Sequence, residues 1–275
     1  MDGSVGSLPR FNTLLTESDG EILSVTFNRP DIRNAVDSEF SHELFALFSA
    51  VARMDDLRIV LLRGAGGNFC AGGRLENFRD MPEWDLSQGP DPLSEWNRVL
   101  GRSMTALDNL PQAVVSVVEG AAVGGGIGLA ACSDVVIAHK DAIFGMPEAR
   151  VGIIPSQVVP FVTRKTGPGP ARLMVATGRR VRGPEALEIG LAHFCCDTTD
   201  EVEATLEQVL TDMLACAPGS VRAAKRLILD SSHKPLEQIL DEAAYVLGPQ
   251  SRGGEAHSGV AAFLDKKKPY WFRKP

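Results

Sequence analysis

The sequence predicts an α/β protein with a helical C-terminal region. Short, nearly all-apolar runs such as RIVLLRG (58–64) and AVVSVVEG (113–120) indicate strands that are covered on both faces. The chain after Pro155 instead has mostly helical patterns. The 275 residues, 44% hydrophobic and 23% charged, are enough for one large core. We therefore expect an α/β core over 1–195 and a helical region over 196–275.

The individual elements follow from local patterns in chain order. Two β-prone runs around Ser18-Asp19-Gly20 predict a hairpin, and Asp37 or Ser38 can cap a helix that reaches about Met54. Residues 79–94 are rich in Pro, Asp and Ser, which is typical of a loop, and a helix from about Glu95 to Leu110 follows. Further elements are a short helix opened by 124–126, two strands within 133–145, and helices over 156–166, 170–177, 184–189, 201–216, 218–230, 235–248 and 255–265.

Composition excludes several classes of protein. The net charge of −7 argues against a general nucleic-acid binder, and no apolar run approaches the roughly 18 residues of a membrane span. The N-terminus lacks the basic start and apolar stretch of a secretory signal. The five cysteines match neither a zinc pattern nor a disulfide framework. We therefore predict a cytoplasmic protein with reduced thiols, no metal and no membrane partner.

Two glycine-rich turns each follow a predicted strand. The first is CAGGRLENF (70–78) and the second is AAVGGGIGLA (121–130). Glycines let the backbone approach a ligand closely and leave the first N–H groups of a helix exposed to an anionic oxygen. Three interpretations are open: close helix–strand packing, a dinucleotide site in which GIGLAA is followed by Glu148, or an oxyanion hole that takes one N–H from each turn.

An oxyanion hole needs a group that moves protons. The sequence has no G-x-S-x-G elbow and no phosphate-binding loop, and its five histidines are scattered. Glu148, in FGMPEARVGIIP (144–155), is the remaining candidate. The alternative role for Glu148 is that of a first-turn helix acid, which would complement the helix dipole.

Five segments in order resemble the crotonase family, also called the enoyl-CoA hydratase/isomerase superfamily. They are FNRPDIRNAV (27–36), NFCAGGRLENF (68–78), AAVGGGIGLAACSDVVIA (121–138), FGMPEARVGIIP (144–155) and GVAAFLDKKKP (259–269). The resemblance implies a spiral of ββα units with a C-terminal helical region for trimer assembly. It also implies an acyl-CoA thioester substrate and no cofactor besides the CoA of that substrate.

The resemblance assigns roles by position. Gly73 and Gly125 would donate the two N–H groups that hold the thioester oxygen, and Glu148 would handle protons. Residues expected to line the substrate site are Ala71, Gly72, Arg74, Leu75, Gly124, Pro147 and Ser156. Residues expected to contact CoA are Arg33, Phe263 and Lys266, the last two from the C-terminal helix, often of a neighbouring subunit in a trimer or a dimer of trimers.

The sequence departs from the best-known hydratases at Gly128, where those enzymes carry a second glutamate. GGGIGLA and IIPSQVVPFV (153–162) are similar to the bacterial methylglutaconyl-CoA and isohexenylglutaconyl-CoA hydratases, and Arg74 could pair with the distal carboxylate of such a chain. We therefore expect syn hydration of a 2-enoyl-CoA. The alternatives are a Δ3/Δ2-enoyl-CoA isomerase with one glutamate and a non-catalytic acyl-CoA-binding protein.

Overall fold

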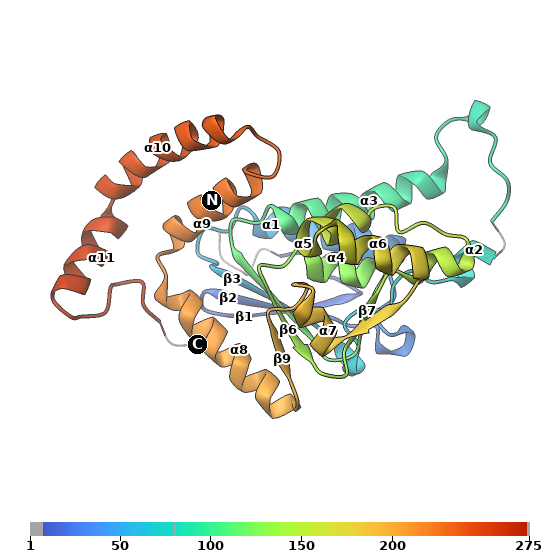
Figure 1. The fold of residues 1–275 in the computed structure, drawn as a ribbon, viewed down its shortest axis with the longest axis horizontal. Coiled ribbons are helices and arrows are strands. Elements are labelled where there is room, and N and C mark those ends of the chain that lie inside the picture. The colour runs from blue at the N-terminus through green and yellow to red at the C-terminus, as the bar shows by residue number, and fades with distance from the viewer. Residues whose placement is uncertain (1–7, 80, 274–275) are drawn as a thin grey trace.

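A parallel sheet with one antiparallel edge strand organises the chain (Figure 1). The structure is a computed structural model that describes residues 8–79 and 81–273. Its main sheet has the order β1-β2-β3-β4-β6-β9. β1 pairs antiparallel with β2 and the other neighbours pair parallel. The strands are β1 (Leu14–Asp19), β2 (Ile22–Phe27), β3 (Ile59–Gly64), β4 (Ala113–Val118), β6 (Val135–His139) and β9 (Phe194–Cys196).

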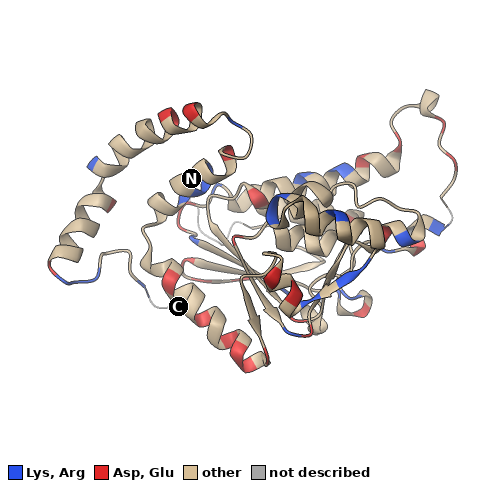
Figure 2. Ribbon diagram, in the orientation of Figure 1, with Lys and Arg blue, Asp and Glu red and all other residues tan. Residues whose placement is uncertain are grey.

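Both faces of the main sheet are covered, which explains the continuous apolar runs of β3 and β4. On one face lie α1 (Ser38–Val51), α3 (Pro92–Asp108), α4 (Gly125–Ala131), α5 (Val159–Thr166) and α6 (Pro168–Thr177) (Figure 1). On the other face, α8 (Thr199–Ala215) packs Val202, Leu206 and Val209 against Ile59 and Val115. Acidic residues recur along α8 (Figure 2) and are exposed, so the helix is amphipathic.

A second, smaller sheet supports the glycine turns. It has the order β5-β7-β8 and consists of β5 (Ala121–Val123), β7 (Ile143–Gly145) and β8 (Arg180–Arg182), which is followed by α7 (Gly183–Glu188). β5 leads directly into α4, and β7 leads into the short helix η5 (Pro147–Val151). β5 and β7 are parallel neighbours, so they deliver the second glycine turn and Glu148 to the same end of this sheet.

Most sequence predictions of elements are confirmed, and the differences have local causes. The sequence analysis missed β5, β8 and β9, because a strand of three residues is too short to show a period. α3 begins at Pro92 rather than Glu95, since the Asp91 carboxylate accepts a hydrogen bond from the Leu93 N–H at 3.0 Å and caps the helix. α10 (Leu236–Arg252) continues through Pro249, beyond the predicted end at 248.

The C-terminal helices extend from the body (Figure 1). After α8 come α9 (Pro218–Asp230), α10 and α11 (Gly254–Leu264), and α10 and α11 expose apolar side chains, among them Leu236, Leu240, Leu247, Val260 and Phe263. β9 includes residue 195, where we predicted a boundary between the core and the C-terminal helical region, and α8 packs on the sheet. The predicted division of the chain into 1–195 and 196–275 stays a prediction. No helix within residues 8–79 and 81–273 is long and apolar enough to span a membrane.

Arg58 connects the core to the C-terminal region. Its side chain is 7% exposed and donates to the carbonyl oxygens of Leu214 at 3.0 Å, Cys216 at 2.6 Å and Trp271 at 2.8 Å. A guanidinium has five donors in a planar fork, which suits the unpaired carbonyls at the end of a helix. One side chain therefore binds the end of α8 and the segment after α11 to the start of β3.

We expect Arg58→Ala to lower the free energy of unfolding by about 3 kcal/mol, because it leaves several buried carbonyl groups without a donor. The matched control is Arg63→Ala on the same strand, whose ion pair with Glu203 at 2.7 Å is partly exposed and worth at most about 1 kcal/mol. Urea unfolding of both variants measures the difference. Equal losses in the two variants would contradict a clamping role for Arg58.

Candidate active site

One small cavity brings together the three residues expected to do chemistry. Gly73, Gly125 and Glu148 all line a cavity of about 80 Å³. Its other walls come from α3, from residues 153–158, and from Val36, Leu75 and Phe78. The convergence of two glycine turns and one carboxylate on one space is what an oxyanion mechanism requires.

In the first glycine turn, the N–H groups of the first two residues are already used. The Cys70 N–H donates to the carbonyl of Ala121 at 2.8 Å, and the Ala71 N–H donates to the carbonyl of Arg33 at 3.0 Å. The Gly73 N–H, by contrast, has no hydrogen-bond partner among the described residues. It lines the cavity and is free to bind an oxygen.

The orientation of the Gly73 N–H follows from a β-bridge with Val36. The Val36 N–H donates to the Gly72 carbonyl at 2.8 Å, and the Arg74 N–H donates to the Val36 carbonyl at 3.4 Å. In a parallel bridge the residue between these two bonds points its own N–H and C=O away from the partner strand. The bridge therefore turns the Gly73 N–H away from Val36.

In the second glycine turn, Gly125 is the first residue of α4. The first N–H groups of a helix have no acceptor within the helix, and the helix dipole places partial positive charge there. The Gly124 N–H donates to the Gly145 carbonyl at 2.9 Å, whereas the Gly125 N–H has no partner within the described part of the chain. Gly125 also lines the cavity, so the second donor is available as well.

The two turns lie in van der Waals contact, and this contact requires glycine. A Cβ on Gly72, whose φ is +91°, would lie 3.0 Å from the Val123 carbonyl oxygen. A Cβ on Gly124, whose φ is +54°, would lie 2.8 Å from Oε1 of Glu148. Close packing and free N–H groups thus occur together, but at different glycines: Gly72 and Gly124 pack, and Gly73 and Gly125 carry the free donors.

The Glu148 carboxylate is half-buried against this contact. Its Oε2 atom has no solvent contact and no hydrogen-bond partner among the described residues. Burial raises the pKa of Glu148 above its ordinary value of 4.5, and a hydrogen bond from its own backbone N–H lowers that pKa in part. A carboxyl group with a raised pKa and a free oxygen can accept and return a proton near neutral pH.

Apolar groups fill the space beside Gly128. A Cβ there would lie 2.5 Å from Cε and 2.9 Å from Sδ of Met104, which is fully buried. Val158 closes the same space, at 3.3 Å from that position. A second carboxylate at this point of α4 would displace Met104, and Gly128 itself is not among the residues that line the cavity.

The structure brings only some of the other predicted residues to the cavity. Leu75 and Ser156 line it. The residues predicted for the site that are not among the lining residues are Ala71, Gly72, Gly124, Pro147, Arg33 and Arg74. Phe263 is 83% exposed on α11, and Lys266 follows that helix. α11 lies at the opposite end of the molecule from α2 (Glu76–Arg79), which follows the first glycine turn (Figure 1).

The sequence analysis assigned no individual residue of α3 to the site. Trp96, Asn97 and Leu100 line it, and the Ser156 hydroxyl donates to Oδ1 of Asn97 at 2.7 Å. Trp96 and Leu100 are four residues apart, which places them on one helix face. The helical pattern indicated that face, but nothing in the sequence showed that it meets residues 153–158.

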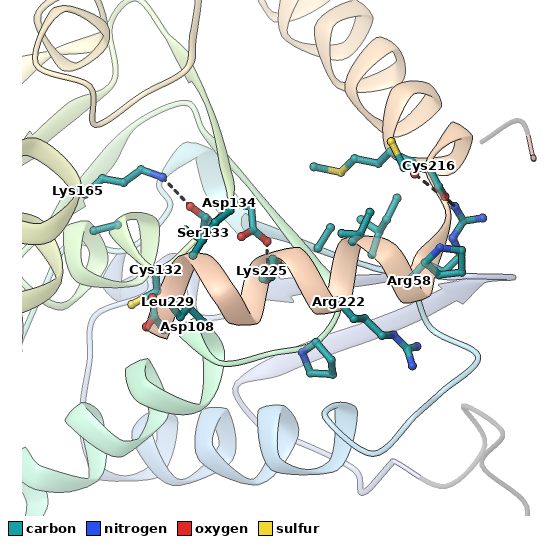
Figure 3. Close-up of a pocket in the computed structure, with 18 of the residues that line it drawn as sticks. Arg58, Asp108, Cys132, Ser133, Asp134, Lys165, Cys216, Arg222, Lys225 and Leu229 are labelled. Atoms are coloured by element: carbon teal, nitrogen blue, oxygen red, sulfur yellow. Dashed lines mark hydrogen bonds and ion pairs between the residues drawn. The ribbon is translucent and has the colours of Figure 1, made fainter. Parts of the chain in front are cut away.

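A larger cavity of about 560 Å³ lies under α9, away from the glycine turns (Figure 3). Its cationic groups already bind protein oxygens: the Lys165 ammonium donates to the Ser133 carbonyl at 2.8 Å, and the Lys225 ammonium to Asp134 at 2.6 Å. Arg164 pairs with Asp108 in the same wall. Because these groups are occupied, we assign the chemistry to the smaller cavity, where a carboxylate oxygen and two N–H groups are free.

The sequence matches the family described as enoyl-CoA hydratase/isomerase over residues 17–274. The chain belongs to the enoyl-CoA hydratase/isomerase family. Carnitinyl-CoA dehydratase of Proteus mirabilis is 30% identical over 262 residues, which cover 92% of this chain and 95% of that protein. This membership and relatives of this kind identify the chain as an enzyme of the enoyl-CoA hydratase/isomerase family.

Solved structures confirm the crotonase fold. Pseudomonas aeruginosa AtuE is 40% identical with a TM-score of 0.90, and the match covers 95% of this chain and 100% of that one. An enoyl-CoA hydratase/isomerase from Marinobacter aquaeolei is 35% identical with a TM-score of 0.89, covering 95% and 99%. Enoyl-CoA hydratase/isomerase membership therefore holds along nearly the whole chain, and the predicted fold is correct.

The contact between the turns predicts a difference between two adjacent glycines. We expect Gly72→Ala to lower the free energy of unfolding by about 1–3 kcal/mol, because alanine is strained at positive φ and its Cβ meets the Val123 carbonyl. Gly73→Ala is the matched control, since its Cβ would meet only Cε2 of Phe78 at an ordinary 3.7 Å. Urea denaturation tests this, and a loss in Gly73→Ala as large as that in Gly72→Ala would contradict it.

Proposed function

We propose that the protein adds water to the double bond of a 2-enoyl-CoA thioester, in the syn sense, through an enolate. The observation that carries this proposal is the convergence of the free Gly73 and Gly125 N–H groups with the free Oε2 of Glu148 on one cavity. The carnitinyl-CoA dehydratase relatives support hydro-lyase chemistry for such a site.

The two N–H groups would bind the thioester carbonyl oxygen. As water adds to C3, the electron pair of the double bond moves through C2 onto that oxygen, which becomes an enolate. Donors already in position stabilise this charge without reorganisation, and each is typically worth about 3–4 kcal/mol at the transition state. The positive end of the α4 dipole adds to the effect at Gly125.

Glu148 would carry the proton in both halves of the reaction. Its carboxylate takes a proton from the water whose oxygen forms the new bond to C3, and the resulting carboxylic acid returns that proton to C2. One carboxyl group therefore suffices, because the proton removed in the first step is the one needed in the second. This fits a site in which Met104 fills the space beside Gly128.

The same observation favours a second candidate, a Δ3/Δ2-enoyl-CoA isomerase. A single carboxyl group can remove a proton from one carbon and return it to another, and no water-binding carboxylate is needed. Non-catalytic acyl-CoA binding is a weaker alternative, because a structural carboxylate would not need a raised pKa and a free oxygen.

The branched or glutaconyl-type acyl chain stays a prediction. No Lys, Arg or His lines the cavity within the described residues, so Arg74 would have to move to pair with a distal carboxylate. For CoA, we propose contacts from Arg33 and, across a trimer, from Phe263 and Lys266 of a neighbouring copy. The exposed apolar side chains of α10 and α11 support such an assembly. We propose no cofactor beyond the CoA of the substrate.

We expect Glu148→Gln to lower kcat for enoyl-CoA hydration by 10²–10⁴-fold, because the amide cannot accept the proton of water. The control is Glu95→Gln, an exposed carboxylate of α3 that lines none of the described cavities. Rates are measured on a panel of straight, branched and carboxylated 2-enoyl-CoAs. A Glu148→Gln variant within a few-fold of wild type on every substrate would contradict catalysis by Glu148.

Labelled water separates the two catalytic candidates. With a 2-enoyl-CoA in H₂¹⁸O, a hydratase forms a 3-hydroxyacyl-CoA that carries ¹⁸O at C3. An isomerase forms the shifted double bond and incorporates no oxygen. Shifted product without ¹⁸O, across the whole substrate panel, would exclude the proposed hydration.

The raised pKa of Glu148 predicts a pH dependence. The base form is needed for the first proton transfer, so kcat/KM should fall as the pH drops through a pKa above 4.5. A pH–rate profile of the wild type checks this, with the residual activity of Glu148→Gln as control, which should lack that limb. A wild-type profile that is flat down to pH 4.5 would contradict a buried carboxylate as the base.

A further inference from the structure

Trp96 forms a wall between two cavities. It lines the catalytic cavity of about 80 Å³ and also a neighbouring cavity of about 290 Å³. The neighbouring cavity is otherwise lined by Ser38 of α1, by Met81 and Pro82, and by residues 91–93 at the start of α3. Within the part of the chain that the structure describes, Trp96 is the only residue that the two linings share.

The catalytic cavity alone is too small for more than a short acyl chain. Pockets that bind small molecules usually measure about 300–1,000 Å³, well above the volume beside Glu148. The neighbouring cavity is close to the lower end of that range, and Met81, Pro82 and Leu93 give it an apolar lining. An acyl chain that extends beyond the catalytic cavity would find matching apolar surface on the far side of Trp96.

The contacts of Trp96 hold its ring by packing alone. Its ring centroid lies 6.3 Å from that of Phe78 at an interplanar angle of 55°, and the ring packs against the main core. Its Nε1 is buried without a hydrogen-bond partner among the described residues. A buried donor without an acceptor costs about 1–3 kcal/mol of stability. Because Nε1 makes no hydrogen bond, a change of the Trp96 rotamer would break none.

We propose that Trp96 sets the acyl-chain length that the enzyme accepts, by closing the catalytic cavity against the neighbouring cavity. The inference rests on the proposed function, since it assigns the acyl chain to the cavity beside Glu148. A smaller side chain at position 96 joins the two spaces and admits longer apolar chains. Trp96 is then a specificity-determining residue, distinct from the groups that handle the proton and the oxyanion.

The test compares Trp96→Ala, Trp96→Leu and Trp96→Phe with the wild type. The measured quantity is the ratio of kcat/KM for 2-decenoyl-CoA to kcat/KM for crotonyl-CoA. We expect this ratio to rise about 10-fold or more in Trp96→Ala, by less in Trp96→Leu, and to stay within about 3-fold in Trp96→Phe, which keeps an aromatic wall. The matched control is Trp84→Ala, because Trp84 lines neither cavity and bonds to the Gly89 carbonyl at 3.1 Å.

Binding of butyryl-CoA and decanoyl-CoA, which cannot be hydrated, separates this inference from the proposed function. Calorimetry should show the same shift in the ratio of affinities, whether or not any enoyl-CoA is turned over. If the alanine variant does not fold, as judged by its melting temperature, the leucine variant carries the test. The proposal would be overturned if the affinity ratio stayed within 2-fold of wild type in Trp96→Ala and Trp96→Leu, or in whichever of the two folds.

Discussion

The contact between the two glycine turns is the constraint on which the site depends. Gly72 lies against the Val123 carbonyl and Gly124 against the Glu148 carboxylate, and both glycines have a positive φ at which other residues are strained. Two chain segments about 50 residues apart therefore meet at backbone distance. This close approach places the next residue of each turn, Gly73 and Gly125, in the lining of the same cavity, each with an N–H that has no partner among the described residues. Glycine is required for the contact, and the free donors follow from it.

The same contact accounts for the electrostatics of Glu148. Packing against the second turn removes water from the carboxylate, which raises its pKa, while its Oε2 is left without a partner. The proton-transfer group and the two hydrogen-bond donors are thus held by regular backbone structure: Gly125 by β5 and α4, Glu148 by β7 and η5, and Gly73 by its bridge to Val36. Preorganised groups of this kind stabilise developing charge best, because nothing has to reorient during the reaction.

The sequence predicted the α/β core and the two glycine turns, since each depends on a local signal. A continuous apolar run located β3, and periodicity located α1. The five family-like segments located Gly73, Gly125 and Glu148, while the catalytic role of Glu148 stays a prediction. Residues brought together only by tertiary packing were missed. Trp96 reaches the site because α3 crosses the cavity, and Met104 fills the space beside Gly128 from the same helix. Arg74, assigned from its neighbours in sequence, is not in the cavity lining, because the bridge to Val36 fixes the backbone but not the arginine side chain.

The larger of the two cavities is not the one to which we assign the catalytic chemistry. The reason is whether the polar groups in each lining already have hydrogen-bond partners. The cavity under α9 is several times larger, yet its lysines and Arg164 are bonded to Ser133, Asp134 and Asp108, which hold the surrounding elements together. These charged groups form hydrogen bonds and ion pairs that stabilise the fold. Around Glu148 the donors and the acceptor are left free, at a cost in stability that only a bound ligand can offset. Unsatisfied groups that converge on one point therefore identify the reactive site better than volume does.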